Sequence, residues 1–253
     1  MQDADVQDIL NRLLEGMRRI LGRRLLGVYL YGSLVTGDFD RDASDIDLLA
    51  VTSGEMDDRD FRLLDKLHQE VEEVHPFWKE RLEIAYLSAG ALQTFKTKAS
   101  RIAVVSPGEP FHFKEAGHDW LINWWTVRER GTALFGLDPR AVIPRISKEE
   151  FREAVREQAG EWREHVFTSR ERPWQAYAIL TLCRALYANE RGELASKQQA
   201  ARWAQRELPE WAALIENALY WRTHWRDREV DHETTYAETV RFVHYLIDKI
   251  QAV

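Results

Sequence analysis

The sequence predicts an α+β protein of two domains, with helices and a mixed sheet in the first domain and an all-helical bundle in the second. Short β-rich runs occur in the first half, at Leu25 to Gly32, Ser44 to Thr52 and Arg81 to Ser88. Apolar residues at helical spacing dominate the second half. At 253 residues and 45% hydrophobic content, the chain can bury two modest cores.

The first domain opens with a predicted helix. From Asp5 to Leu21 the apolar residues recur at helical spacing, and Gly22 ends the pattern. The three strands follow, and a helix near Asp57 to Val74 separates the second strand from the third. Beyond residue 100 the strand signals fade, so we expect the segment from Gly117 to Gly136 to be helical.

Two prolines between Asp138 and Ser147 mark the predicted domain boundary. We place the first domain at residues 1–146 and the second at residues 147–253. Consecutive helices with apolar faces favour a bundle. The expected helices are Lys148 to Phe167, Trp174 to Asn189, Lys197 to Glu207, Glu210 to Trp221 and His232 to Ile250.

The composition restricts the partners and the compartment. The net charge is −7, and Lys and Arg are scattered among Asp and Glu, whereas a duplex-binding protein needs a concentrated basic face. A cationic small molecule fits this charge better. The single cysteine, Cys183, excludes an internal disulfide, and the chain has neither a signal-peptide core nor a membrane-length apolar run. We expect a monomeric, cytoplasmic protein that binds neither nucleic acid nor membranes.

Two aspartates lie in the second predicted strand. Asp45 and Asp47 are two residues apart, so their carboxylates project from the same face of a strand. Like charges at this distance repel unless one pKa rises or a cation binds. Mg²⁺ prefers carboxylate oxygens and completes its coordination with water and phosphate oxygens. The pair therefore predicts metal-dependent phosphate chemistry.

Other residues extend this predicted site. Gly32 and Ser33 follow the first strand, where the glycine lets the backbone approach a phosphate while the hydroxyl and the first N–H groups of a short helix face it. Glu83 interrupts the apolar third strand, where a charge is costly unless it is paired, and a metal would pair it. An Asp-x-Asp pair or a Gly-Ser turn alone is a weak signal. The Asp-x-Asp pair, the Gly-Ser turn and Glu83 together form a specific signal.

The motif resembles that of a known superfamily. "GS" at residues 32–33 followed by "SDIDLL" at 44–49 is similar to the signature of the polymerase-β-like nucleotidyltransferases. Four later segments look like the aminoglycoside 3''-type adenylyltransferases, some of which modify streptomycin and spectinomycin: "RERGTALFG" (128–136), "LTLCRALY" (180–187), "GELASKQQAARWA" (192–204) and "FVHYL" (242–246). The resemblance implies an N-terminal nucleotidyltransferase domain and a helical domain, with ATP and the antibiotic held in the cleft between them.

The resemblance also implies roles for individual residues. Asp45, Asp47 and Glu83 would bind Mg²⁺, and Glu83 would also be the catalytic base. The residues implied at the nucleotide are Gly32, Ser33, Ser44, Arg184 and Lys197, together with an aromatic residue that is either Tyr220 or Trp221. Trp120 and Trp174 would line the acceptor site. Trp174 lies about where family members that act on streptomycin tend to carry an acidic residue, which favours spectinomycin or a relative as the acceptor.

The predicted activity is Mg²⁺-dependent transfer of AMP from ATP to a hydroxyl of an aminoglycoside or aminocyclitol, with release of pyrophosphate. One alternative is transfer to another small molecule or to a protein, as in toxin-antitoxin nucleotidyltransferases, whose ribonuclease partners have an Arg-x-His spacing weakly similar to the pair Arg226 and His232. A second alternative is a degenerate fold that binds nucleotide without catalysis. Because both Asp47 and Glu83 are present, the sequence favours an active enzyme.

Overall fold

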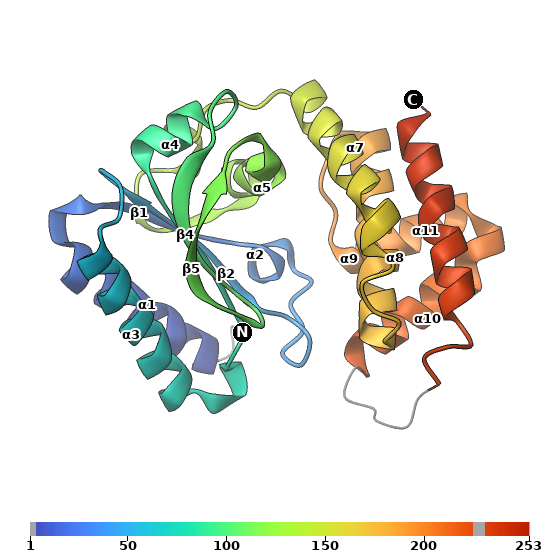
Figure 1. The fold of residues 1–253 in the computed structure, drawn as a ribbon, viewed down its shortest axis with the longest axis horizontal. Helices are drawn as coiled ribbons and strands as arrows, with labels where there is room; N and C mark the ends of the chain where they lie inside the picture. The colour runs from blue at the N-terminus through green and yellow to red at the C-terminus, as the bar shows by residue number, and fades with distance from the viewer. Residues whose placement is uncertain (1–3, 225–230, 253) are drawn as a thin grey trace. The chain divides into compact units, whose positions relative to one another are not determined.

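The structure of the chain is a computed structural model that describes residues 4–224 and 231–252 (Figure 1). The chain divides into two compact units. The first comprises Met1–Phe39 and Ser44–Arg145, and the second comprises Asp40–Ala43 and Ile146–Val253. The assignment of separate roles to residues 1–146 and 147–253 stays a prediction. Within the described residues, no helix is both long enough and apolar enough to span a membrane.

A six-stranded mixed sheet forms the centre of the first unit, in the order β5-β4-β3-β2-β1-β6. Strands β2 and β3 run parallel, and the other neighbouring strands are antiparallel. The strand bounds are Leu25–Tyr31 (β1), Ile46–Thr52 (β2), Leu82–Ser88 (β3), Ser100–Ser106 (β4), Glu109–Ala116 (β5) and Thr132–Gly136 (β6). The predicted α+β class, with a mixed sheet in the first half and helices in the second, is confirmed.

Helices α1 (Ala4–Leu21) and α3 (Asp58–Val74) pack side by side and share a hydrophobic core with one face of the sheet (Figure 1). Alternate residues of the central strands supply that face, among them Leu30, Leu48 and Ile84. The intervening residues of β2 and β3 point to the opposite face. Asp47 and Glu83 belong to this second set, so they lie away from the core under α1 and α3.

Shorter helices complete the first unit. Helix α2 (Ser33–Thr36) follows β1, α4 (Ala89–Thr94) follows β3, and α5 (Leu121–Arg130) precedes β6. The remaining short elements are α6 (Pro139–Val142) and the 3-10 turns η1 (Gly22–Arg24), η2 (Pro76–Trp78) and η3 (His118–Trp120).

Two expectations for residues 100–136 were wrong. The strand signal does not end at residue 100, because β4 and β5 form a hairpin whose turn contains Gly108 at a φ of +77°. The predicted helix from Gly117 to Gly136 ends at Arg130. Gly131 then leaves the helical conformation, and Thr132–Gly136 pairs with β1 as an edge strand. Pairing with a strand distant in sequence overrides the local helical pattern.

The second unit is the predicted bundle of helices around its own hydrophobic core. Capping boxes at Ser147 and Ser196 fix the first turns of α7 and α9. The bounds are Lys148–His165 (α7), Arg172–Arg191 (α8), Lys197–Glu207 (α9), Pro209–Trp211 (η4), Ala212–Thr223 (α10) and Tyr236–Gln251 (α11).

Candidate functional site

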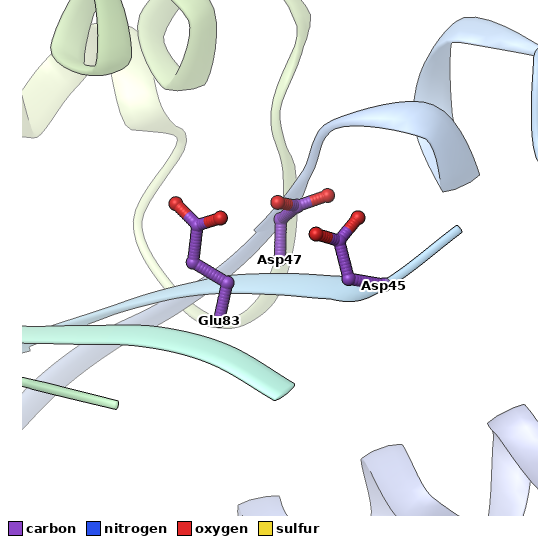
Figure 2. A group of neighbouring side chains, drawn as sticks. All are labelled: Asp45, Asp47 and Glu83. Carbon is purple, nitrogen blue, oxygen red and sulfur yellow. The ribbon is translucent and has the colours of Figure 1, made fainter. Parts of the chain in front are cut away.

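Three carboxylates meet at one end of the central strands. Asp47 lies in β2 and Glu83 in β3, and the parallel register pairs these two residues directly. Asp45 lies just before β2. Figure 2 shows the three side chains pointing toward one another on the same side of the strands. One ligand oxygen from each residue lies within 4.8 Å of those of the other two.

The donor set fits a hard divalent cation. All three groups offer carboxylate oxygens, and Asp47 is 8% exposed while Asp45 and Glu83 are half-buried. Gathering three negative charges in a partly buried position is unfavourable without a positive counter-charge. Mg²⁺ binds through few carboxylates and keeps positions for water and phosphate oxygens, which matches an arrangement of this kind.

Gly32 makes room for Asp47. The residue before it, Tyr31, is the cross-strand partner of Asp47. A Cβ atom on Gly32 would lie 1.8 Å from Oδ2 of Asp47, and the φ of Gly32 is +69°. Only glycine satisfies both the backbone conformation and the close approach. The Gly32 that the sequence indicated as a phosphate-approach position therefore also shapes the carboxylate cluster.

Both serines of the motif precede the three carboxylates in sequence. Ser33 begins α2, and its hydroxyl is buried without a hydrogen-bond partner among the described residues. A buried hydroxyl of this kind is normally satisfied, so a ligand that accepts a hydrogen bond fits here. Ser44 is 3% exposed, and its carbonyl accepts a hydrogen bond from the guanidinium of Arg81.

Tyr31 is a site residue that the sequence analysis did not identify. It is 5% exposed and lies on the same face of the sheet as Asp47 and Glu83. Burial raises the pKa of Tyr31 well above its ordinary value, and the carboxylates of Glu83, Asp47 and Asp45 raise it further. Tyr31 therefore stays a neutral phenol beside the carboxylates. The sequence signal was its position one residue before Gly32.

Trp120 is the remaining predicted site residue of the first unit. Trp120 ends η3 and packs on Trp124, with ring centroids 5.3 Å apart, and the ammonium of Lys114 lies 5.4 Å from the centre of the Trp120 ring. Trp120 is half-buried. Its predicted role at the acceptor stays a prediction.

In the second unit, Trp174 and Lys197 both contact Tyr177. The indole of Trp174 packs on Trp162 and Tyr177, and its N–H donates to the carbonyl of His165 at 3.2 Å. The ammonium of Lys197, at the start of α9, lies 5.0 Å from the centre of the Tyr177 ring. Arg184 is half-buried on α8.

The two aromatic candidates on α10 differ in exposure. Tyr220 is 55% exposed and stacks on His224 with ring centroids 3.8 Å apart, whereas Trp221 is 6% exposed and belongs to the helical core. A ligand can therefore reach the Tyr220 ring more readily. Arg226, of the pair Arg226 and His232, lies outside the described residues.

Comparisons with known proteins cover both units. A family model described as nucleotidyltransferase domain matches residues 10–88, and one described as aminoglycoside adenylyltransferase, C-terminal domain, matches residues 141–249. A spectinomycin 9-adenylyltransferase of Campylobacter jejuni is 26% identical over 208 residues, which are 79% of this chain and 78% of the relative. An aminoglycoside (3'') (9) adenylyltransferase of Escherichia coli is 25% identical over 99% of this chain and 97% of its own.

A solved structure has the same fold. It is a crystal structure of a spectinomycin adenyltransferase from Enterococcus faecialis with ATP and spectinomycin, and it matches with a TM-score of 0.77. The match covers 97% of this chain and 99% of the other at 18% sequence identity. At that identity the likeness shows the fold alone.

Proposed function

The chain belongs to the aminoglycoside adenylyltransferase family of nucleotidyltransferases, and from this premise we propose that it transfers AMP from ATP to a hydroxyl of a cationic aminoglycoside or aminocyclitol, releasing pyrophosphate. The observation that carries the proposal is the convergence of Asp45, Asp47 and Glu83, with ligand oxygens within 4.8 Å, beside the Gly32–Ser33 turn. This arrangement combines a cation site with a position for a phosphate.

Asp45, Asp47 and Glu83 hold Mg²⁺ in this proposal. When bound, Mg²⁺ supplies positive charge that makes an acceptor hydroxyl more acidic and offsets the charge of the triphosphate. Glu83 is half-buried and accepts the proton of the attacking hydroxyl through a carboxylate oxygen. Tyr31 stays neutral near Glu83, and its buried hydroxyl has no hydrogen-bond partner among the described residues, so it offers a donor at the site without competing for that proton.

Residues of both units bind the substrates in the proposal. Ser33 donates its buried hydroxyl to the triphosphate, and Gly32 and Ser44 shape the backbone around it. Arg184 and Lys197 contribute positive charge to the nucleotide, and the exposed Tyr220, rather than the buried Trp221, supplies an aromatic face to the adenine. Trp120 and Trp174 offer aromatic surface to the acceptor. The net charge of −7 attracts a polycation.

The test is pyrophosphate release across a panel of aminoglycosides and aminocyclitols with the wild type and two variants. Asp47→Asn removes a metal-binding charge at constant shape, so we expect almost no turnover. Glu83→Gln retains ATP binding and loses turnover, because a positioned base acts on the barrier more than on ground-state binding. Glu115→Gln, on the exposed edge strand β5, is the control and should match the wild type.

The outcomes separate the parts of this proposal. Turnover of Asp47→Asn near the wild-type rate overturns the metal role of Asp47. Turnover of Glu83→Gln near that rate assigns the base to another residue, and Glu80 is then the next candidate. A wild type that releases no pyrophosphate with any antibiotic, but adenylylates a protein, overturns the proposed acceptor class.

A further inference from the structure

Asp45 differs from the other two carboxylates in how its backbone is held. Asp47 and Glu83 lie inside β2 and β3, where the parallel ladder fixes their register. Asp45 precedes β2, so no strand ladder fixes its position. A ligand outside the ladder needs another anchor to keep its oxygen within 4.8 Å of its neighbours.

Arg81 holds the residues on both sides of Asp45. Its guanidinium donates from Nη2 to the carbonyl oxygen of Ser44, the residue before Asp45. Its own carbonyl accepts a hydrogen bond of 3.0 Å from the backbone N–H of Ile46, the residue after Asp45. One side chain and one peptide group of the same residue thus fix the short segment that carries the Asp45 carboxylate.

Aromatic residues hold Arg81 in turn. The guanidinium carbon lies 4.5 Å from the ring centre of Trp78 and 4.9 Å from that of Phe77, which is cation–π geometry. The backbone N–H of Arg81 donates to the carbonyl of Trp78 at 3.1 Å. Trp78 is 1% exposed and belongs to the core of the first unit. The position of Arg81 is therefore fixed by the rigid part of the fold.

The turn before Arg81 adopts an uncommon conformation. Glu80 has a φ of +59°, a value that residues other than glycine rarely adopt. Its backbone N–H donates to the Glu72 carboxylate on α3 at 3.0 Å, which helps to hold this conformation. The turn directs the chain from η2 into β3 and places Arg81 opposite Ser44. Backbone strain of this kind is retained where the surrounding structure requires it.

We propose that Arg81 is a positioning residue for the metal centre, which fixes the backbone of Asp45 so that its carboxylate joins those of Asp47 and Glu83. The inference rests on the proposed function, in which the three carboxylates bind the metal. Removing the anchor leaves the ligand in place but allows its backbone to move, so the metal affinity falls while the fold persists. Groups that orient metal ligands commonly affect metal affinity by 10- to 100-fold.

The direct test is titration of the nucleotide-free protein with Mn²⁺, followed by electron paramagnetic resonance of the free ion. Arg81→Met keeps an apolar stem on Trp78 and removes the donor, and we expect about 10- to 100-fold weaker Mn²⁺ binding. Arg101→Met is the matched control, because Arg101 also lies over an aromatic ring, Phe113, but belongs to β4 and contacts β5. It should bind Mn²⁺ as the wild type does. The Mn²⁺ affinity of Arg81→Lys, which keeps one charged donor, should lie between those of Arg81→Met and the wild type.

A double-mutant cycle tests whether Arg81 acts through Asp45. In an Asp45→Asn background, Arg81→Met should cause no further loss of Mn²⁺ affinity, since the ligand that it positions is already gone. An equal loss in both backgrounds overturns the inference. Circular dichroism and melting temperature report the fold, and if Arg81→Met does not fold, Arg81→Lys carries the same cycle.

The result also distinguishes this inference from the function on which it rests. A wild type that binds no Mn²⁺ overturns both the metal centre and the role of Arg81. Binding that is lost in Asp47→Asn but unchanged in Arg81→Met leaves the metal centre intact and overturns the inference alone. Turnover of Arg81→Met that recovers at high Mg²⁺ supports it, because a structural defect would not respond to the metal concentration.

Discussion

At the scale of single residues, the requirement for glycine at position 32 comes from the side chain of Asp47 on the neighbouring strand. We expect Gly32→Ala to lose metal binding and turnover, because the new Cβ would lie 1.8 Å from Oδ2 of Asp47 and must displace that carboxylate. The variant should also lose stability on the order of 1–3 kcal/mol from the positive φ. Mn²⁺ titration and pyrophosphate release measure the first effect, and thermal unfolding measures the second.

Gly37→Ala is the matched control for this prediction. Gly37 ends the same short helix at a φ of +78°, but a Cβ there has no atom within 4 Å. Gly37 lies in the left-handed helical region, with a ψ of 17°, whereas Gly32 has a ψ of −148°, so Gly37→Ala should lose less stability than Gly32→Ala. The clash with Asp47 is absent at Gly37. The explanation fails if Gly37→Ala loses as much Mn²⁺ affinity as Gly32→Ala.

The sequence could predict the carboxylates because their pattern is local. Two aspartates at strand spacing must share a face, and a charge inside an apolar strand indicates a partner. The roles of Tyr31 and Arg81 depend instead on contacts that no local pattern contains. Tyr31 meets Glu83 only once three strands are in register, and Arg81 meets Ser44 only once the turn at Glu80 is formed.

At the scale of elements, a buried histidine links α3 to β3. His68 is 3% exposed, and its Nε2 lies 2.7 Å from the hydroxyl of Tyr86. Burial lowers the pKa of His68 from 6.5 to about 3. Below pH 6.5 the unfolded chain therefore binds a proton that the folded chain does not. The free energy of unfolding should fall by about 1.4 kcal/mol per pH unit between pH 6.5 and 3 from this group.

His68→Gln tests this pH dependence, because the amide can still hydrogen-bond to Tyr86 and does not titrate. Urea unfolding at pH 6.5 and pH 5 should show a smaller drop for the variant than for the wild type, by about 2 kcal/mol. His112→Gln, on the exposed strand β5, should keep the wild-type drop. Equal drops in the wild type and His68→Gln would contradict the buried, neutral histidine.

Gln175 joins α8 to the segment that leads into α11. The residue is 1% exposed, and its amide N–H groups donate to the carbonyls of Arg170 and His232 at 2.6 and 2.7 Å. Its amide oxygen accepts from the hydroxyls of Thr235 and Thr239, both at 2.9 Å. Gln175→Leu leaves several of these groups buried without partners, so we expect a loss on the order of 3 kcal/mol in urea unfolding.

Gln205→Leu provides the comparison for Gln175. Gln205 also donates to a backbone carbonyl, that of Ala212, and to the Glu216 carboxylate, but the site is only partly buried and water can replace these bonds. The expected loss is about 1 kcal/mol or less. If the two leucine variants lose the same stability, burial does not set the cost at Gln175.

The elements that the sequence predicted are those whose own residues carry the signal. Strand β2 is apolar on both faces except for Asp47 and its last residue, Thr52, and α1 repeats its apolar residues at helical spacing. Strand β6 was missed for a different reason. Strand β6 is partly exposed along its length and exists because β1 offers a free edge, so Thr132–Gly136 resembles an extension of α5 until the sheet is known.

At the scale of the whole molecule, both units should contribute to nucleotide affinity. A ligand that binds only the folded state stabilises it by RT ln(1 + [L]/Kd), about 2.7 kcal/mol at a hundredfold excess over Kd. Lys197→Ala should shrink the shift in melting temperature that ATP and Mg²⁺ produce. Lys148→Ala is the matched control, because Lys148 also directly follows the serine of a capping box, at the start of α7. Equal shifts in both variants would remove Lys197 from the nucleotide site.

The last prediction concerns the choice of acceptor, which depends on the negative charge of the chain and on Trp174 in the helical unit. Trp174 packs on Trp162 and Tyr177, so an indole occupies the place where the family resemblance leads us to expect a streptomycin-binding carboxylate. A guanidinium of streptomycin would then lose charged hydrogen bonds, a cost on the order of 1–3 kcal/mol. We therefore expect kcat/KM for spectinomycin to exceed that for streptomycin by about tenfold or more, measured by pyrophosphate release, with calorimetry giving the same ranking. Tight binding of streptomycin without binding of spectinomycin would reverse the assignment, and Trp174 would then have no part in excluding the guanidinium.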